Sequence, residues 1–143
     1  MKLMRVLRVG SVAALLVAAV ACNNSVTTPS SAPYSATDLR VGTGATAATG
    51  SKVTVIYTGW LFDPTKTEGK GLVFDTTVGG DPFSFTLGNG SVIAGWDQGI
   101  PGMRVGGVRR LVIPPSLGYG GTRFGAVPPY STLVFEVTLI AVQ

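Results

Sequence analysis

Two long segments carry large apolar residues at every second position, and this period of two predicts two strands with one face buried. In 52–61, one face carries Val53, Val55 and Tyr57, while the residues between them lie on the other. In 131–142, one face carries Leu133, Phe135, Val137 and Leu139. We therefore expect both segments to bury their apolar faces in the core.

Shorter apolar segments between turns and loops add further strands. They are expected at 39–41, 72–76, 83–85 and 108–113. A polar loop is expected at 62–71, and a long surface loop at 114–129, which is rich in glycine and proline.

One segment, around 93–99, has helical periodicity. Ile93, Trp96 and Ile100 would share one face of a short helix, with Ser91 as its N-cap. Two glycines inside the segment lower its intrinsic stability, so tertiary packing must hold it. Several strands with one short helix indicate an α+β domain with a mostly antiparallel sheet.

The first 21 residues have the layout of a secretory signal peptide. A basic start with Lys2, Arg5 and Arg8 precedes an apolar run at 9–20, which ends in small residues. The run is shorter than the roughly 20 residues that a helix needs to span a bilayer. A permanent anchor helix is therefore the less favoured alternative.

Cys22 is the only cysteine of the 143 residues, so no disulfide can form within the chain. Its position directly after Ala19-Val20-Ala21 resembles the lipobox of bacterial lipoproteins, whose cysteine is acylated after cleavage. The same residues also fit an ordinary secretory cleavage site, which would leave a soluble secreted or periplasmic protein.

The lipobox interpretation places the protein in the cell envelope, held to a membrane by a lipid. In a Gram-negative organism this would be the outer membrane or the periplasmic side. Segment 22–36 is rich in Ser, Thr, Asn and Pro and is predicted to be a disordered tether. The folded domain would then span 37–143.

Charge does not indicate a nucleic-acid partner. The chain has 11 basic and 7 acidic residues. Three of the basic residues lie in the signal segment, so the mature chain would carry a net charge of +1. Arg109-Arg110 lies in an apolar run and is interpreted as a solvated strand position.

The stretch 42–47 superficially matches a dinucleotide fingerprint, but no helix is expected to follow it, so a turn is favoured.

The composition also excludes several kinds of catalytic site. There is no histidine and one cysteine, which rules out Ser-His and Cys-His arrangements and the usual zinc ligand sets. Any activity must therefore come from other side chains.

Seven of the twelve aromatic residues fall in one ordered set of motifs along the last 90 residues. The set runs Tyr57-Thr58-Gly59, Phe74-Asp75, Phe83-Ser84-Phe85, Val92-Ile93-Ala94-Gly95-Trp96, Gly118-Tyr119-Gly120, Val127-Pro128-Pro129 and Thr132-Leu133-Val134-Phe135. Its order and spacing resemble the FKBP-type peptidyl-prolyl cis–trans isomerases. The resemblance implies a five- or six-stranded, mostly antiparallel sheet bent around one short helix.

The same resemblance implies a catalytic role for three residues. Trp96 would form the floor of an apolar cup that receives the proline ring. The Tyr119 hydroxyl would donate a hydrogen bond to a substrate carbonyl, and Asp75 would lie at the edge of the cup near the rotating amide.

Eight further residues would bind substrate, mostly as walls and rim of the cup. They are Tyr57, Phe74, Phe83, Phe85, Val92, Ile93, Val127 and Phe135. Taken singly, Phe85, Val92 and Phe135 are more typical of core positions, and so is Trp96 on a weak helix. Only the joint pattern favours the cup. The sequence departs from the minimal family pattern in a longer 60–73 stretch. It also has a shorter 120–127 loop, with Arg123 and Phe124 near where a histidine is common and Ala126-Val127 where two isoleucines are common.

The implied function is acceleration of X–Pro bond rotation during protein folding in the envelope, without a cofactor or metal. The implied partners are proline-containing polypeptides and rapamycin-type macrolides. An alternative from another class is a lipid-anchored chaperone that holds apolar peptides without turnover. A purely structural envelope protein would not explain the ordered aromatic set.

Overall fold

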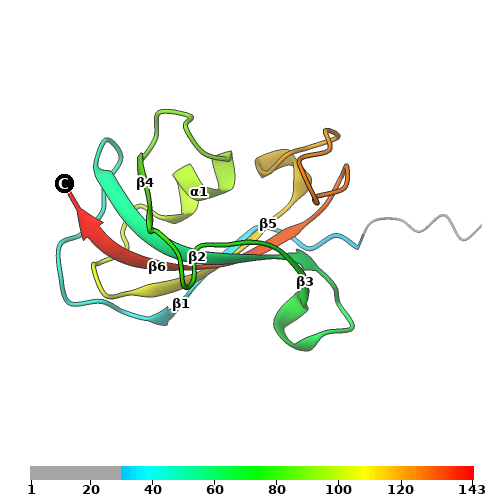
Figure 1. Cartoon of the computed structure of the whole chain (residues 1–143), viewed down its shortest axis with the longest axis horizontal. Coiled ribbons are helices and arrows are strands. Elements are labelled where there is room, and N and C mark those ends of the chain that lie inside the picture. The colour runs from blue at the N-terminus through cyan, green and yellow to red at the C-terminus, as the bar shows by residue number, and fades with distance from the viewer. Residues whose placement is uncertain (1–29) are drawn as a thin grey trace, which may run out of the picture.

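The alternating segments form one bent antiparallel sheet with a short helix on its concave face (Figure 1). The computed structural model describes residues 30–143. The predicted signal peptide, Cys22 and most of the predicted tether lie outside these residues. The strands are β1 (Ser35–Arg40), β2 (Lys52–Phe62), β3 (Lys70–Thr76), β4 (Phe83–Thr86), β5 (Val108–Ile113) and β6 (Leu133–Val142).

The sheet has the strand order β1-β5-β6-β2-β3, and β4 pairs with the first half of β2. Helix α1 (Ala94–Gly99) and two short 3₁₀ turns, Thr67–Gly69 and Pro115–Leu117, complete the elements of the described chain. The predicted α+β class, with a six-stranded antiparallel sheet and one short helix, is confirmed.

The hydrophobic core lies between the concave face of the sheet and α1. Val53 and Val55 of β2 and Leu133, Val137 and Leu139 of β6 are fully buried there, as their alternation predicts. The core fixes the long central strands, and these carry several of the side chains that matter below.

A glycine allows α1 to pack directly on β5. A Cβ atom at Gly95 would lie 2.7 Å from the side chain of Ile113, too close for any other residue. The glycine that weakens the helix in isolation therefore permits the close approach that stabilises it in the fold.

The sequence led us to expect the folded domain to begin at Thr37, but the folded part of the chain begins earlier. Strand β1 starts at Ser35, and Ser35 pairs with Val112 of β5. Tyr34 packs against the core, and its hydroxyl lies 3.5 Å from the Gly95 carbonyl oxygen. The expected tether is thus ordered at its C-terminal end.

Arg109 is not a solvated strand residue, which corrects the interpretation of the Arg109-Arg110 pair. Its guanidinium binds the carboxylate of Asp38 on β1, with Nε–Oδ1 2.7 Å. It also donates to the carbonyl oxygens of Gly99 and Pro101, at the end of α1. Arg109 therefore ties together β1, β5 and the helix.

Arg110 is also ion-paired, on the outer face of the sheet. It contacts Glu136 of β6 and Glu68 of the connection between β2 and β3. Lys70 binds the same two carboxylates. Its ammonium group lies 4.9 Å from the ring centre of Trp60.

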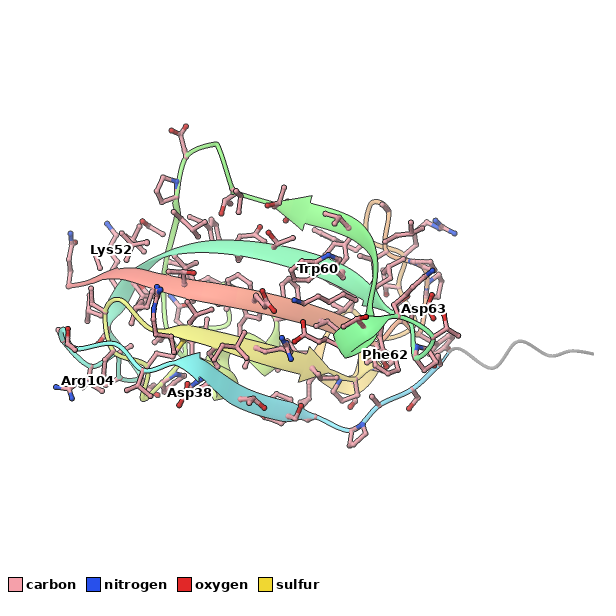
Figure 2. The ribbon with its side chains drawn as sticks, turned by 90° about the horizontal axis from the view of Figure 1, so that it is seen from below. Asp38, Lys52, Trp60, Phe62, Asp63 and Arg104 are labelled. Carbon is pink, nitrogen blue, oxygen red and sulfur yellow. The ribbon has the colours of Figure 1, made fainter. Side chains whose placement is uncertain are left out.

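The long 60–73 stretch therefore folds toward the outer face, away from the concave side that holds α1. Figure 2 shows this outer face, with Trp60 on β2 and Phe62 and Asp63 where β2 ends. The predicted loop 62–71 is shorter at both ends, because Phe62 belongs to β2, and Lys70 and Gly71 belong to β3. Within residues 30–143, no helix has the length and apolar character needed to cross a membrane.

Candidate active site

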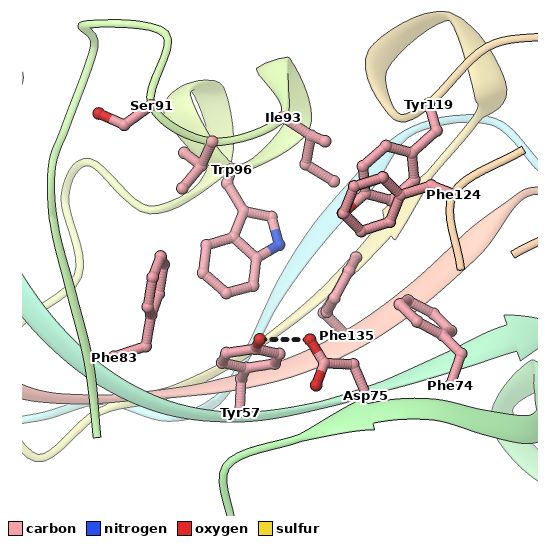
Figure 3. Close-up of a pocket in the computed structure, with 11 residues that line it drawn as sticks. Tyr57, Phe74, Asp75, Phe83, Ser91, Ile93, Trp96, Tyr119, Phe124 and Phe135 are labelled. Atoms are coloured by element: carbon pink, nitrogen blue, oxygen red, sulfur yellow. Dashed lines mark hydrogen bonds between the residues drawn. The ribbon is translucent and has the colours of Figure 1, made fainter. Parts of the chain in front are cut away.

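A cavity of about 430 Å³ opens on the concave side of the sheet, beside α1 (Figure 3). Most of its lining is aromatic. The lining residues are Tyr57, Phe74, Asp75, Phe83, Ser91, Val92, Ile93, Trp96, Tyr119, Phe124 and Phe135. They come from β2, β3, β4, α1, β6 and two loops, so segments far apart in the sequence build one site.

Trp96 forms the floor of the cavity and is 3% exposed. Tyr57 and Phe135 both meet its indole edge to face, with centroid distances of 4.9 and 5.2 Å and interplanar angles of 86° and 84°. This arrangement suits the charge distribution of aromatic rings and fixes their mutual orientation. The floor is thus a rigid apolar surface.

The indole N–H of Trp96 is buried and makes no hydrogen bond to another residue of 30–143. A buried donor without a protein partner is uncommon, because its desolvation is costly. Because the nitrogen itself is buried, a bound molecule could reach this N–H only if a neighbouring ring moved.

Gly59 makes room for the rings of the wall. A Cβ atom there would lie 2.7 Å from Phe74 Cζ and 2.8 Å from Phe135 Cε1. The two phenylalanines meet edge to face, 5.5 Å apart at 85°. A larger residue at position 59 would push one of these rings into the cavity.

A β-bulge in strand β3 brings two consecutive side chains to the cavity. Gly59 pairs with Asp75 and Trp60 with Val73, so Phe74 is an extra residue between them. In a regular strand, neighbouring side chains point to opposite faces. Here both Phe74 and Asp75 line the cavity.

Asp75 has a hydrogen-bond partner within the site. The Tyr57 hydroxyl donates to Asp75 Oδ2 at 2.5 Å (Figure 3). Burial, and then the neighbouring carboxylate, raise the pKa of Tyr57 well above its ordinary value. The phenol is therefore a neutral donor that holds the carboxylate at the cavity edge.

Asp97 fixes the loop that carries Val92 and Ile93. Its carboxylate accepts hydrogen bonds from the backbone N–H groups of Gly88 and Gly90, at 2.8 and 3.2 Å. The backbone N–H of Ile93 has no hydrogen bond to the rest of the described chain, so it can donate to a ligand. Ser91 is not the N-cap, which corrects the sequence prediction: Ile93 holds that position, without a side-chain cap.

Tyr119 lies on the other side of the cavity mouth, in the loop that follows the Pro115–Leu117 turn (Figure 3). Burial and the negative charge of Asp75 raise its pKa. Phe124 stacks on it almost in parallel, at 4.2 Å and 5°. Like Tyr57, Tyr119 stays neutral and able to donate.

Two residues predicted to bind substrate lie outside the cavity. Phe85 is 6% exposed and packs behind Phe83 and Trp96, with ring centroids 5.3 and 5.6 Å away. Val127 is 1% exposed and belongs to the core. The other nine predicted side chains line the cavity.

Two lining residues were not predicted: Ser91 and Phe124. Ser91 gives no signal of its own beyond its place next to Val92. Phe124 does give a signal in the sequence, because an aromatic residue in a glycine-rich loop just after Gly118-Tyr119-Gly120 has no evident core to enter. A large apolar side chain left on such a loop is a reason to look for a site nearby.

The arrangement suits a compact apolar group flanked by carbonyl oxygens. The aromatic floor and walls can exclude water from a ring, and the Ile93 N–H and the Tyr119 hydroxyl are donors at its rim. The ionisable or hydroxyl-bearing side chains among the described lining residues are Asp75, Ser91, Tyr57 and Tyr119, and Asp75 is already hydrogen-bonded to Tyr57.

Comparison with known proteins agrees with this geometry. The family model described as FKBP-type peptidyl-prolyl cis-trans isomerase matches residues 44–140. The FK506-binding protein of Neisseria meningitidis serogroup A is 47% identical over 107 residues, which make up 73% of this chain and 92% of the relative. FKBP53 of Arabidopsis thaliana is 50% identical over 101 residues, 70% of this chain and 20% of that protein.

Solved structures show the same fold. FkpA from Escherichia coli has a TM-score of 0.64 and 37% identity, and the match covers 80% of this chain and 50% of that one. AtFKBP13 has a TM-score of 0.65 and 37% identity, covering 77% and 93%.

Some relatives are much longer than the chain. It spans about a fifth of FK506-binding protein 4 of Neurospora crassa (21%) and of FK506-binding protein 3 of Candida albicans (23%). Since the family model nevertheless covers most of this chain, and the Neisseria relative is matched over nearly its whole length, the chain belongs to the FKBP-type peptidyl-prolyl cis–trans isomerases.

Proposed function

We propose that this protein accelerates rotation about X–Pro peptide bonds of other polypeptides as they fold in the cell envelope. The observation that carries this proposal is the aromatic cavity with Trp96 at its floor and hydrogen-bond donors around it. The proline ring would pack on the indole of Trp96, between Tyr57 and Phe135.

The chemistry needs a changed environment rather than a reactive group. Rotation breaks amide resonance, with a barrier of about 18–20 kcal/mol, and takes tens to hundreds of seconds without a catalyst. The planar amide is more dipolar than the twisted one, so an apolar cavity disfavours the ground state relative to the transition state.

Donors at the cavity mouth add orientation to this effect. The Ile93 N–H and the Tyr119 hydroxyl would each bind a substrate carbonyl and hold the chain on both sides of the rotating bond. An acceleration of about 10⁴ requires a barrier lower by about 5.4 kcal/mol. Desolvation, orientation and one or two hydrogen bonds together can supply this.

The proposed location follows from the N-terminal sequence. A signal segment that ends at Ala21 would leave Cys22 for acylation, and the lipid would hold the domain at a membrane. The substrates would then be proline-containing chains in the envelope. Because several relatives are FK506-binding proteins by name, we also propose that the cavity binds macrolides of the FK506 and rapamycin type.

The competing function is a holding chaperone that binds apolar peptide without turnover. A refolding assay limited by proline isomerisation separates the two, because only an isomerase speeds the slow phase at catalytic concentrations. We expect residues 30–143 to accelerate this phase and a macrolide of the rapamycin type to abolish the acceleration. Binding of unfolded protein with an unchanged slow phase would contradict the isomerase proposal.

A further inference from the structure

Tyr119 has one aromatic neighbour among the described residues, and that neighbour is Phe124. The two rings lie 4.2 Å apart and within 5° of parallel. Figure 3 shows them face to face at the cavity mouth, opposite Trp96 and Tyr57. Both rings line the cavity, so the pair forms one side of its entrance.

The backbone of Phe124 is held by a tight turn. Phe124 N–H donates to the Val127 carbonyl oxygen at 3.1 Å, and Val127 N–H donates back to the Phe124 carbonyl oxygen at 2.8 Å. Val127 is 1% exposed, so its side chain anchors the turn in the core. The turn thereby presents Phe124 to the cavity, and this explains why the predicted contact residue Val127 lies beneath the site.

Phe124 itself is 57% exposed. A phenylalanine with more than half of its surface in water gains little from burial in the core. Its aromatic contact among the described residues is the Tyr119 ring. The chain neighbours of Tyr119, Gly118 and Gly120, have no side chain that could restrict that ring. Tyr119 also makes no side-chain hydrogen bond within residues 30–143 that would fix its hydroxyl.

We propose that Phe124 is a positioning residue for Tyr119: by stacking on the phenol ring, it aims the hydroxyl at the carbonyl of the bound X–Pro segment. This proposal rests on the proposed isomerase function, because it concerns the same site. Without the stack, the phenol would sample other orientations and would less often meet the twisted amide. The loss should therefore appear mainly in kcat rather than in KM.

A double-mutant cycle tests this coupling directly. Removal of the hydroxyl by Tyr119→Phe keeps the ring and should lower kcat/KM roughly 2- to 12-fold in the wild-type background. If Phe124 positions the hydroxyl, the same substitution in a Phe124→Leu background should change kcat/KM less than about twofold. Phe124→Tyr retains a stacking ring and should restore most of the activity. Independent, additive effects of the two substitutions would overturn the proposal.

A matched control separates positioning from general loosening of the loop. Tyr130 lies in the same loop and is 62% exposed, but it does not line the cavity. Tyr130→Leu should leave kcat/KM and its dependence on the Tyr119 hydroxyl unchanged. If Tyr130→Leu removes this dependence as Phe124→Leu does, the stack has no special role and the proposal is wrong.

A second measurement does not depend on activity. A stacked ring shifts the NMR resonances of the ring that it covers, so the Tyr119 ring signals, assigned through Tyr119→Phe, should move in Phe124→Leu and not in Tyr130→Leu. Unchanged Tyr119 signals would overturn the positioning role. A wild-type protein with this stack but no isomerase activity would instead contradict the proposed function.

Discussion

The Tyr57 hydroxyl binds the carboxylate of Asp75 at 2.5 Å, across the junction of β2 and β3 at the edge of the cavity. The two residues meet because a β-bulge turns Asp75 to the same side as Phe74. Tyr57 also packs edge to face on Trp96, so one side chain links the apolar floor to the site's charged group. The orientation of Asp75 therefore depends on the aromatic packing.

Tyr57→Phe should reduce activity more than stability. The substitution keeps the ring on Trp96 but leaves the Asp75 carboxylate without its donor. We expect an unfolding free energy lower by about 1 kcal/mol, because the hydrogen bond is partly exposed. We expect a several-fold lower kcat/KM, since the carboxylate can then turn toward solvent. Thermal unfolding and peptide kinetics on the same preparation measure both effects.

Thr58→Val provides the matched control. Thr58 Oγ1 and Thr76 Oγ1 are 2.9 Å apart, so this substitution also removes a side-chain hydrogen bond between β2 and β3, but on the outer face. It should lower stability by a similar small amount and leave kcat/KM unchanged. Equal losses of activity in Thr58→Val and Tyr57→Phe would mean that only the pairing of the strands matters.

The activity should be nearly independent of pH around neutrality. The chain has no histidine, and the pKa values of Tyr57 and Tyr119 are raised above the ordinary tyrosine value. A raised tyrosine pKa means that the fold favours the protonated form. Its contribution is full below about pH 10 and is lost only as the pH rises through the higher folded value.

We therefore expect a flat profile of kcat/KM between about pH 6 and 9. The decrease should come only at strongly alkaline pH, where the phenols ionise and can no longer donate. Kinetics across this range with one X–Pro peptide provide the test. An inflection near pH 7 would show that another titrating group controls the reaction.

The two long strands could be predicted because their faces meet different environments. Val53 and Val55 face the core, while Thr54 and Thr58 face outward, and this difference is what the alternation records. Strand β1 has no such contrast, since all six of its residues are exposed. Its start at Ser35 depends on pairing with β5 and on the ion pair of Asp38 with Arg109, neither of which leaves a local pattern.

The site was predicted less completely, because burial depends on what lies above each side chain. Phe83 and Phe85 share a face of β4, yet Phe83 lines the cavity while Phe85 is covered beside Trp96. Likewise, Val127 was expected to contact substrate but lies in the core, whereas Phe124 was not expected to and lines the cavity. The turn that joins them places their side chains on these different sides. Periodicity gives the face of a strand, not the depth of a residue.

Phe135→Ala should lose stability and activity together. Phe135 is 3% exposed and contacts the rings of Tyr57, Phe74 and Trp96. Its removal should cost about 3–5 kcal/mol of unfolding free energy and let the remaining rings shift.

Tyr119→Phe should instead lose modest activity at a nearly unchanged midpoint of thermal unfolding. A Tyr119→Phe protein that melts many degrees lower with full specific activity would make Tyr119 a structural residue.

Cys22→Ser tests the proposed membrane anchor in cells. The substitution should abolish incorporation of labelled palmitate and release the protein from the membrane fraction, because serine offers no thiol for acylation. Isomerase activity should be unchanged, since the site lies wholly within residues 57–135. Wild-type protein that takes up no label, and whose mass equals the unmodified chain from Cys22, would favour the soluble secreted form.

The position at which the chain is shortened should decide its stability. A chain that begins at Ser30 keeps Tyr34, which packs against the core beside Gly95 and Leu111, and all of β1. A chain that begins at Thr37 loses Tyr34 and the first two residues of β1 but keeps the pair of Asp38 and Arg109. Because Tyr34 is half-buried, its loss should lower the unfolding free energy by about 1–2 kcal/mol.

The shorter chain should thus melt several degrees lower but keep its kcat/KM at low temperature, because Tyr34 lies under α1 and does not line the cavity. Tyr34→Ala in the chain that begins at Ser30 separates the ring from the strand: it should reproduce most of the decrease in midpoint if the ring is responsible. Equal midpoints for the chains that begin at Ser30 and Thr37 would show that Tyr34 and the first two residues of β1 add nothing measurable to stability.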